Sequence, residues 1–198
     1  MRHYQWLSLN DDSQRDTCDV EFLDLGLKAV GTQNTSKYQA NWKLDASESW
    51  ITQSIRVAVH GSRWARSLEL QRDFNGIWSH SISETGVQPN DLPRPGIASD
   101  VDLSQALDVD LGKCPLTNVM PIRRLGLLEH KVARTPLVMA WIEMPSLRVI
   151  SSDQYYSSLD QNHVRYESGT RQVDVTLSVD DFGVVQDYPN LARRTQEL

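Results

Sequence analysis

Two aspartates and two arginines that lie close together in the sequence are the residues best suited to chemistry. Asp108 and Asp110 stand two residues apart in the segment 106–111, and Arg123 and Arg124 follow within one short connection. Apolar residues alternate with the aspartates in that segment. The alternation predicts a strand with one apolar face and one face that carries both carboxylates.

The carboxylate pair has two interpretations. Glycosidases use two carboxylates as acid and base, so Asp108 and Asp110 would suit a hydrolase or isomerase. Because buried carboxylates beside arginines are more often structural pairs, we favour salt bridges to Arg123 or Arg124, or hydrogen bonds to nearby amides. As a further alternative, the two arginines would hold a phosphate or sulfate head group.

Other catalytic signatures are missing from the sequence. It contains no Walker-type phosphate loop, no Gly-x-Gly-x-x-Gly, no Gly-x-Ser-x-Gly and no His-Glu-x-x-His. The five histidines are scattered without ligand spacing, and Cys18 lies far from Cys114. We therefore predict no cofactor and no metal site, and we expect both cysteines to be free thiols.

Aromatic residues form a second set of candidates, because the chain has six tryptophans and six tyrosines. Aromatic rings stack on sugar faces and line apolar pockets. Trp42 and Trp78 lie on or beside expected strands, and Gln154, Tyr156 and Tyr166 are candidates for a polar rim at the mouth of a pocket. The more common alternative is that the tryptophans are ordinary core residues and the others satisfied turn residues.

Alternation of apolar and polar residues runs through most of the chain and predicts the strands that must position these side chains. Asn75-Gly76 predicts a tight hairpin turn, because both central positions of a type I′ turn need positive φ. Asn118 is a candidate cap for a short helix that follows it. We expect strands over residues 20–28, 37–44, 51–59, 67–71, from 77, 106–111, 137–144, 147–155, 164–167, 171–180 and 184–188, with turns at 31–36 and 45–49.

About ten strands and little helix indicate a mainly β protein with a single antiparallel sheet and one or two short helices. Such a sheet is expected to be barrel-like or half-closed and curled, because open edges are a liability and long sheets twist. The interior of this β shell is then either filled by side chains or able to hold an apolar ligand. The length of 198 residues fits one domain over residues 1–198.

Two segments lack the alternation of apolar and polar residues that is typical of strands. Residues 84–100 hold two glycines and three of the eight prolines, which predicts an exposed loop or, as the alternative, a lid. The charged tail 191–198 is expected to fray.

Charge and hydropathy exclude some classes of partner. A net charge of −6 argues against non-specific nucleic-acid binding, which needs a basic face. No run approaches the roughly 20 apolar residues of a membrane-spanning helix. Since no long apolar stretch follows the basic start, we expect no signal peptide and a cytoplasmic location.

The sequence resembles the bacterial putative glycolipid-binding family, long known as a domain of unknown function. The resemblance covers nearly the whole chain and is tightest from about 106 to 189. Its residues are Asp108-Val-Asp-Leu, Thr117-Asn118, Pro121-Ile-Arg-Arg-Leu125, Gln154-x-Tyr156, Tyr166-x-Ser168 and Val179-Asp-x-x-Gly-x-Val-x-Asp-Tyr-Pro189, with looser similarity at Tyr38, Asp45, Trp50 and Asn75-Gly76-x-Trp78.

This resemblance implies a β-rich, barrel-like fold similar to lipoprotein carriers, with a lipid or glycolipid bound in the cavity of the shell. We therefore expect a non-enzymatic binding protein with an apolar cavity. The alternatives are a carboxylate-dependent hydrolase or isomerase and a structural or interaction module with a filled core. The ligand-binding candidates are Arg123, Arg124, Asp108, Asp110, Asn118, Trp42, Trp78, Gln154, Tyr156 and Tyr166.

Overall fold

One long sheet makes up most of the protein. The computed structural model describes residues 1–195, in which fifteen strands, one short α-helix and one 3-10 helix occur. The strands are β1 (Arg2–Ser8), β2 (Arg15–Leu23), β3 (Gly26–Asn34), β4 (Gln39–Ala46), β5 (Ser54–His60), β6 (Trp64–Arg72), β7 (Trp78–Gly86), β8 (Gly96–Ile97), β9 (Ala106–Leu111), β10 (Thr135–Ile142), β11 (Arg148–Ser158), β12 (His163–Ser168), β13 (Val173–Val179), β14 (Val185–Tyr188) and β15 (Ala192–Arg194).

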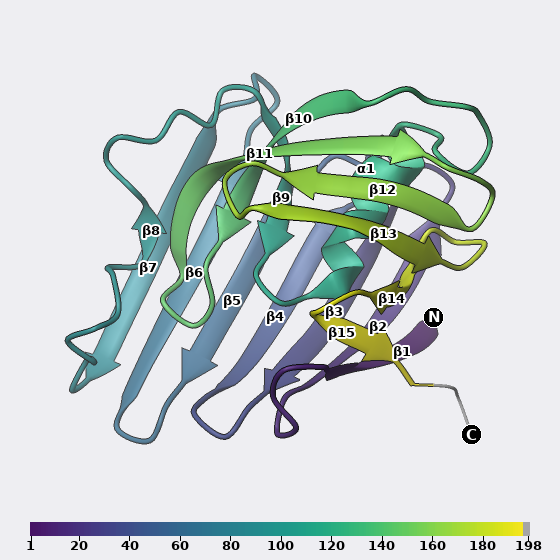
Figure 1. Ribbon diagram of the computed structural model, residues 1–198. Coiled ribbons are helices and arrows are strands. Elements are labelled where there is room, and N and C mark those ends of the chain that lie inside the picture. Colours follow the sequence, from purple (N-terminus) through teal and green to yellow (C-terminus); the bar gives the residue numbers. More distant parts are fainter. Residues whose placement is uncertain (196–198) are drawn as a thin grey trace.

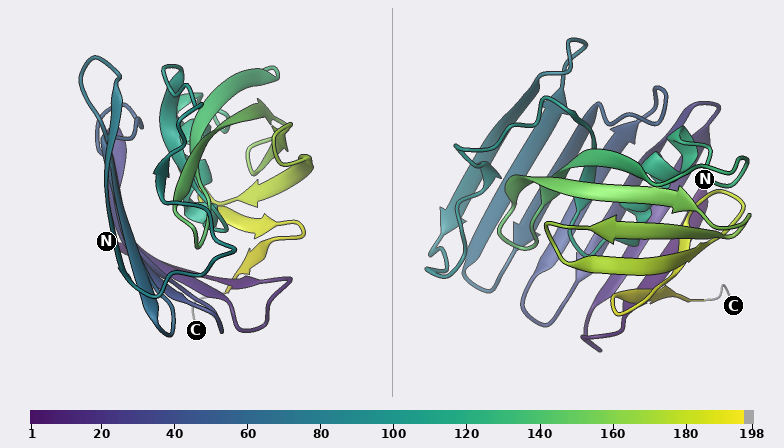
Figure 2. Two further views of the ribbon diagram at one scale, coloured as in Figure 1. Left: turned by 90° about the vertical axis from the view of Figure 1, so that its left-hand side faces the viewer. Right: turned by 45° about the horizontal axis from the view of Figure 1, so that its top comes forward.

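The sheet is curled into two facing halves. Its order runs β7-β6-β5-β4-β3-β2-β1-β15-β14-β13-β12-β11-β10-β9, and β8 pairs with β11. We call β1 to β7 the wall and β9 to β14 the cover, with β15 joining β1 to β14. Figure 1 and Figure 2 show the cover folded over one face of the wall, with the two helices between them. The mainly β, half-closed fold that the sequence predicts is confirmed.

The sheet does not close into a barrel, because its terminal strands β7 and β9 do not pair with each other. Pairing is antiparallel throughout except at two places, where β9 runs parallel to β10 and β8 runs parallel to β11. The barrel-like alternative of the sequence prediction is therefore wrong, and the curled sheet is the correct one.

The wall is the predicted meander of neighbouring strands, but its first half differs from the prediction in several places. The alternating leucines of residues 20–28 suggested one strand, but Leu23 pairs with Gly26 across a tight turn in which Leu25 is exposed. Gly31 was expected in a turn and instead lies within β3. A Cβ there would come within 2.3 Å of the Trp42 ring, so the glycine makes room for that indole.

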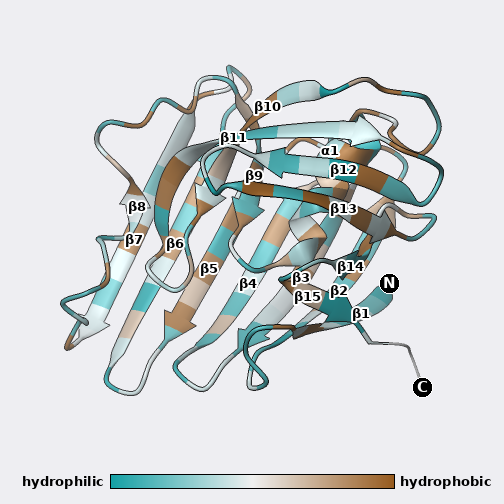
Figure 3. Cartoon of the chain, viewed as in Figure 1, coloured by the Kyte–Doolittle hydropathy of each residue, from teal (hydrophilic) through white to brown (hydrophobic). Residues whose placement is uncertain are grey.

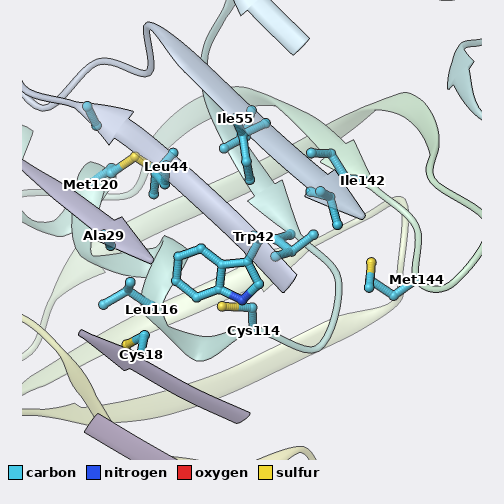
Figure 4. Packing of buried hydrophobic residues seen from close by; sticks show 14 of the residues in the cluster. Cys18, Ala29, Trp42, Leu44, Ile55, Cys114, Leu116, Met120, Ile142 and Met144 are labelled. Carbon is cyan, nitrogen blue, oxygen red and sulfur yellow. The ribbon is translucent and has the colours of Figure 1, made fainter. Parts of the chain in front are cut away.

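Hydrophobic and hydrophilic residues alternate along the strands of the wall (Figure 3), and the buried positions of β4 and β5 alternate with exposed or partly exposed ones. Trp42 and Leu44 of β4 and Ile55 of β5 are buried on the inner face of the wall. The 3-10 helix η1 (Pro115–Asn118) and the helix α1 (Val119–Arg124) fill the space opposite. Figure 4 shows the Trp42 indole beside Cys114 and Leu116, between the wall and η1.

Side chains fill the space between wall and cover. One continuous cluster of buried apolar residues joins the wall, η1, α1, β9 and β10, and a second lies under β11 to β14. Burying each large apolar side chain contributes about 1.5–3 kcal/mol. The expected acyl-chain cavity inside the shell is therefore occupied by core, as the filled-core alternative describes.

The segment 84–100 and the C-terminal tail are more ordered than the sequence predicts. Residues 87–95 form a loop after β7, whereas Gly96–Ile97 belongs to the sheet, so the 84–100 segment is partly strand. The tail was expected to fray from residue 191, but Ala192–Arg194 is β15 and pairs with β1 and β14. The rest of that prediction, at 196–198, lies outside the described residues. Neither helix in residues 1–195 is long and apolar enough to cross a membrane.

Candidate functional site

The two aspartates of β9 lie on one face of the strand, as predicted, and both are buried. Asp108 pairs with Arg124 of α1, whose Nη1 donates to Asp108 Oδ1 at 2.6 Å and also to the Trp50 carbonyl at 3.2 Å. Burial raises the pKa of the Asp108 carboxyl to about 6, against the opposing effect of the Arg124 charge. The pair is the predicted structural salt bridge.

Asp110 is the centre of a buried network drawn from three other parts of the chain. Its Oδ2 accepts hydrogen bonds of 2.6 Å from both Gln154 Nε2 of β11 and Arg171 Nη2, which precedes β13. Its Oδ1 accepts a bond of 3.3 Å from the Thr117 hydroxyl of η1. The sequence predicted Arg123, Arg124 or nearby amides as partners of the aspartates, so the arginine that pairs with Asp110 is a correction.

Tyrosines extend this network through the cover. The Tyr156 hydroxyl donates to Asn118 Oδ1 at 2.8 Å, and Tyr166, directly opposite Tyr156 in the sheet, contacts Arg171. The two rings lie 5.0 Å apart. Burial raises the pKa of both phenols well above the usual range, so they act as neutral hydrogen-bonding groups. We call Asp110, Thr117, Asn118, Gln154, Tyr156, Tyr166 and Arg171 the Asp110 network.

The helix start at Asn118 is confirmed, but its chemistry differs from the prediction. Asn118 is the residue before α1, yet its side chain makes no capping bond to that helix. Its Nδ2 donates to the Pro115 carbonyl at 3.1 Å while its Oδ1 accepts from Tyr156. The amide therefore joins η1 to β11.

A cleft of about 530 Å³ opens beside the Asp110 network. Its lining combines Trp141 and Tyr188 with the cations Lys113 and Arg171. The Arg171 guanidinium lies 5.4 Å from the centre of the Trp141 ring and so belongs to both the cleft and the network. The other lining residues are Gly112, Glu143, Met144, Gln172, Val173, Asp174, Val175, Pro189, Asn190 and Leu191.

Two hydrogen-bond donors in this cleft lining have no acceptor among residues 1–195. They are the indole N–H of Trp141 and the Nε–H of Arg171. Both nitrogen atoms are shielded from solvent, so neither donor faces the open part of the cleft. The cleft itself offers aromatic faces, two cations and carboxylates within one small volume.

A larger groove of about 1040 Å³ runs along β1, β13 and β15. Two of its cations are paired within the chain, Arg193 with Asp187 at 3.1 Å and Arg194 with Asp180 at 2.6 Å, while Arg2 lies over the Phe182 ring. The smaller cleft is the better candidate site because it adjoins the Asp110 network.

None of the ten predicted site residues lines this cleft, and three of them also lie outside the Asp110 network and the Asp108–Arg124 pair. Trp42 is part of the core, and Trp78 donates its indole N–H to the Ala106 carbonyl at 3.0 Å. Arg123 forms a surface pair with Glu129 at 3.1 Å. Of the ten candidates, Asp110, Asn118, Gln154, Tyr156 and Tyr166 come together in the network, and Asp108 and Arg124 form the separate pair.

Arg171 and Trp141 were not on the candidate list. Arg171 follows the turn at Gly169-Thr170, and nothing in its sequence neighbourhood distinguishes it from a solvent-exposed arginine. Trp141 stands in a run of apolar residues that predicts a buried strand. The positions of Arg171 and Trp141 at the cleft could not be predicted from the sequence. Both depend on the fold of the cover, which brings Asp110 near Arg171.

Within residues 1–195, no group of three or more His, Cys, Asp or Glu side chains is arranged to hold a metal ion. The Asp108 and Asp110 carboxylates are both engaged by arginines in the interior. The hydrolase or isomerase hypothesis needs both of them in an open cleft, and this arrangement does not provide that.

Comparison with known proteins gives the family. A family model described as putative glycolipid-binding matches residues 5–194. The chain belongs to this family. A crystal structure of a DUF1089 family protein from Pseudomonas aeruginosa is similar to it, with a TM-score of 0.69, 27% sequence identity and coverage of 91% of this chain and 92% of that chain. Among curated proteins, none matches the sequence.

The resemblance to the putative glycolipid-binding family is therefore confirmed. The matched region contains all of the Asp110 network and all residues that line the cleft.

Proposed function

We propose that the protein binds the sugar head group of a glycolipid in the cleft beside Asp110, without catalysing a reaction. The observation that carries this proposal is the cleft lining, which places the aromatic side chains of Trp141 and Tyr188 beside charged side chains of both signs. Sugars can stack on aromatic rings and form hydrogen bonds with charged groups. The family description supports the same ligand class.

The composition of the cleft suits a saccharide. Trp141 and Tyr188 offer aromatic faces on which sugar rings stack. Glu143 and Asp174 accept hydrogen bonds from sugar hydroxyls, and Lys113 donates them. The volume of about 530 Å³ lies within the range of about 300–1,000 Å³ that is typical of small-molecule sites.

The apolar part of the ligand has a place on the same surface. Val173, Val175 and Leu191 are half-buried, line the cleft and offer a shallow apolar wall for the first part of an acyl chain. Since the space between wall and cover is core, the rest of the chain would remain outside the protein. This differs from a carrier that encloses its lipid.

The Asp110 network positions the site in this proposal. Arg171 Nη2 is held by Asp110, which fixes the guanidinium beside the Trp141 ring in the cleft lining. Asp110 is in turn held by Gln154 and Thr117. A fixed arginine loses less conformational entropy on binding than a mobile one.

Calorimetric titration with octyl glucoside below its micellar concentration, and with free glucose, tests the proposal. The variant Trp141→Phe reduces the aromatic face of the cleft, and we expect roughly tenfold weaker binding, which corresponds to about 1.4 kcal/mol. Urea unfolding of the variant checks that it remains folded at the temperature of the titration. Trp42→Phe is the matched control, since it makes the same substitution in the core, away from the cleft.

The outcomes separate the alternatives. Binding of the glycoside that falls in Trp141→Phe and not in Trp42→Phe supports the site, and additional binding of glucose assigns the affinity to the sugar. Equal binding by both variants, or no binding of either probe by a folded protein, would overturn the proposal. Lipids extracted from the purified protein and identified by mass spectrometry would show the natural ligand class.

A further inference from the structure

The edge of the sheet at β7 is bare. β7 ends the wall (Figure 1), and every residue of Ser79–Gly86 is exposed. Strand edges present unpaired N–H and C=O groups, and proteins usually protect them with lysines, prolines, bulges or a covering segment. β7 has the sequence WSHSISETG, with no lysine and no proline, and its register with β6 is unbroken.

The other end of the sheet is protected in the usual way. At β9, the Thr52 N–H donates to the Leu107 carbonyl at 3.1 Å, and the Val109 N–H donates to the Thr52 hydroxyl at 3.2 Å. Thr52 is buried and belongs to the connection between β4 and β5. The contrast shows that an open edge is a particular property of β7.

The register fixes which groups of β7 point outward. Asp73 N bonds to Ile77 O before the strand, and Val87 N bonds to Arg63 O after it. Because hydrogen-bonded pairs alternate in an antiparallel ladder, the odd-numbered residues of β7 bond to β6. The N–H and C=O groups of the even-numbered residues, 78 to 86, therefore point away from the sheet.

We propose that this edge pairs with the β7 edge of a second copy of the chain, antiparallel and about a two-fold axis at Ile82. This register places all five outward-pointing residues in hydrogen-bonded pairs, which would give ten N–H···O=C bonds across the axis. Isologous two-fold contacts of this kind are the commonest symmetry of protein dimers. The two walls would then form one continuous sheet.

Side chains along β7 complement one another in this register. His80 and Glu84 of the two copies would face each other twice, and Ile82 would face itself. The Glu84 carboxylate also lies 3.3 Å from Arg66 Nε of its own chain. Exposed Ile77 (63%) would lie opposite exposed Val87 (71%) at both ends. The serine and threonine residues of the outer face would pair among themselves. Apolar pairs directly across strands stabilise a sheet.

The neighbouring registers pair fewer backbone groups. A two-fold axis at Ser81 or at Ser83 would pair four of the five outward-pointing residues and would place Ile82 opposite His80 or Glu84. An axis at Glu84 would place two carboxylates opposite each other, and like charges directly opposite are destabilising. The axis at Ile82 is the register that pairs all five residues and places Ile82 opposite itself.

β8 does not compete for this edge. It pairs with β11, and it touches β7 through the inner face, where a Cβ on Gly96 would come within 2.7 Å of the His80 ring. Figure 2 shows the segment around β8 on the side of the wall that faces the cover. The N–H and C=O groups at the edge remain free for a second strand.

Size-exclusion chromatography with light scattering on the full chain, over a range of protein concentrations, tests this inference. We expect a concentration-dependent dimer. Ile82→Lys would place two ammonium groups on the axis and should convert the protein to a monomer. Val30→Lys is the matched control, because Val30 is also an apolar strand residue of the wall and both side chains are 45% exposed. It should leave the dimer intact.

A cysteine variant tests the register itself. Ile82→Cys should form a disulfide between copies on mild oxidation, because residues in a hydrogen-bonded pair have Cα atoms about 5.5 Å apart. Val30→Cys should not, and the native Cys18 and Cys114 are buried. A monomeric wild-type protein, a dimer that survives Ile82→Lys, or a dimer whose Ile82→Cys variant fails to cross-link would each overturn the inference.

Discussion

Removing Arg124 should destabilise the protein in a manner that depends on pH. Asp108 is fully buried and Arg124 is its charge partner. In the variant Arg124→Leu, the carboxyl has no counter-charge and must either stay ionised in the core or take up a proton. Proton uptake is the cheaper course near neutral pH, so the pKa of Asp108 should rise far above its wild-type value of about 6.

The magnitude follows from linkage. In the wild type, a folded pKa of about 6 against an unfolded value near 3.9 means that stability is lost as pH rises from about 4 to 6, after which Asp108 contributes no further change. In the variant, the loss continues above pH 6 at about 1.4 kcal/mol per pH unit. At pH 7.5 the additional electrostatic cost is therefore about 2 kcal/mol, and at pH 5 it is near zero.

The lost hydrogen bond to the Trp50 carbonyl adds about 1 kcal/mol at every pH. We therefore expect Arg124→Leu to cost about 1 kcal/mol at pH 5 and about 3 kcal/mol at pH 7.5, which agrees with the range for breaking a buried pair. Urea unfolding followed by tryptophan fluorescence at both pH values measures this difference. Other titrating groups cancel, since they are the same in both proteins.

The double variant Asp108→Asn/Arg124→Leu provides the control. Without a carboxyl at 108, the cost of losing Arg124 should no longer change between pH 5 and 7.5. A pH-independent cost in the single variant, or a pH-dependent one in the Asp108→Asn background, would refute the electrostatic account of this pair.

Three other substitutions test separate parts of the structure. Asp16 is buried and its pKa is raised to about 6, so Asp16→Asn should abolish a stability loss of about 3 kcal/mol between pH 4 and 8, as measured by urea unfolding. Tyr156→Phe should cost about 1–3 kcal/mol, because it leaves Asn118 Oδ1 without its donor; an unchanged urea midpoint would contradict the network. Leu44→Ala should cost about 2–5 kcal/mol in thermal unfolding, whereas Val30→Ala on the outer face should cost little.

Local alternation was enough to predict most of the wall, since β4, β5 and β6 each have a buried and an exposed face. The prediction from alternation was wrong where contacts with a neighbouring strand determine the residue type. Gly31 was assigned to a turn because glycine is common there, yet its lack of a side chain accommodates Trp42 of the next strand. β1 was missed because Arg2 to Ser8 is mostly polar, although Tyr4 and Trp6 are buried on one face.

The candidate site could be predicted in part for a related reason. The family resemblance and the alternation in β9 identified Asp110, Gln154, Tyr156 and Tyr166, which do lie together. Arg171 could not be found, because its partner is 61 residues away in the sequence and its neighbours form an ordinary turn. Ion pairs across a curled sheet depend on the curl, which the alternation does not specify.

The two edge strands of the sheet, β9 and β7, differ in whether another segment covers them. This difference accounts for the location of both proposed surfaces. β9 is turned inward, so its edge is capped by Thr52 and its polar face can bury Asp108 and Asp110 against arginines from the helix and the cover. This buried polar face positions Arg171 at the cleft. Within residues 1–195 no such segment covers the edge of β7, so its backbone groups remain available. The residues of the cleft come from none of the strands β1 to β8, and pairing through β7 would therefore leave ligand binding in the cover unobstructed.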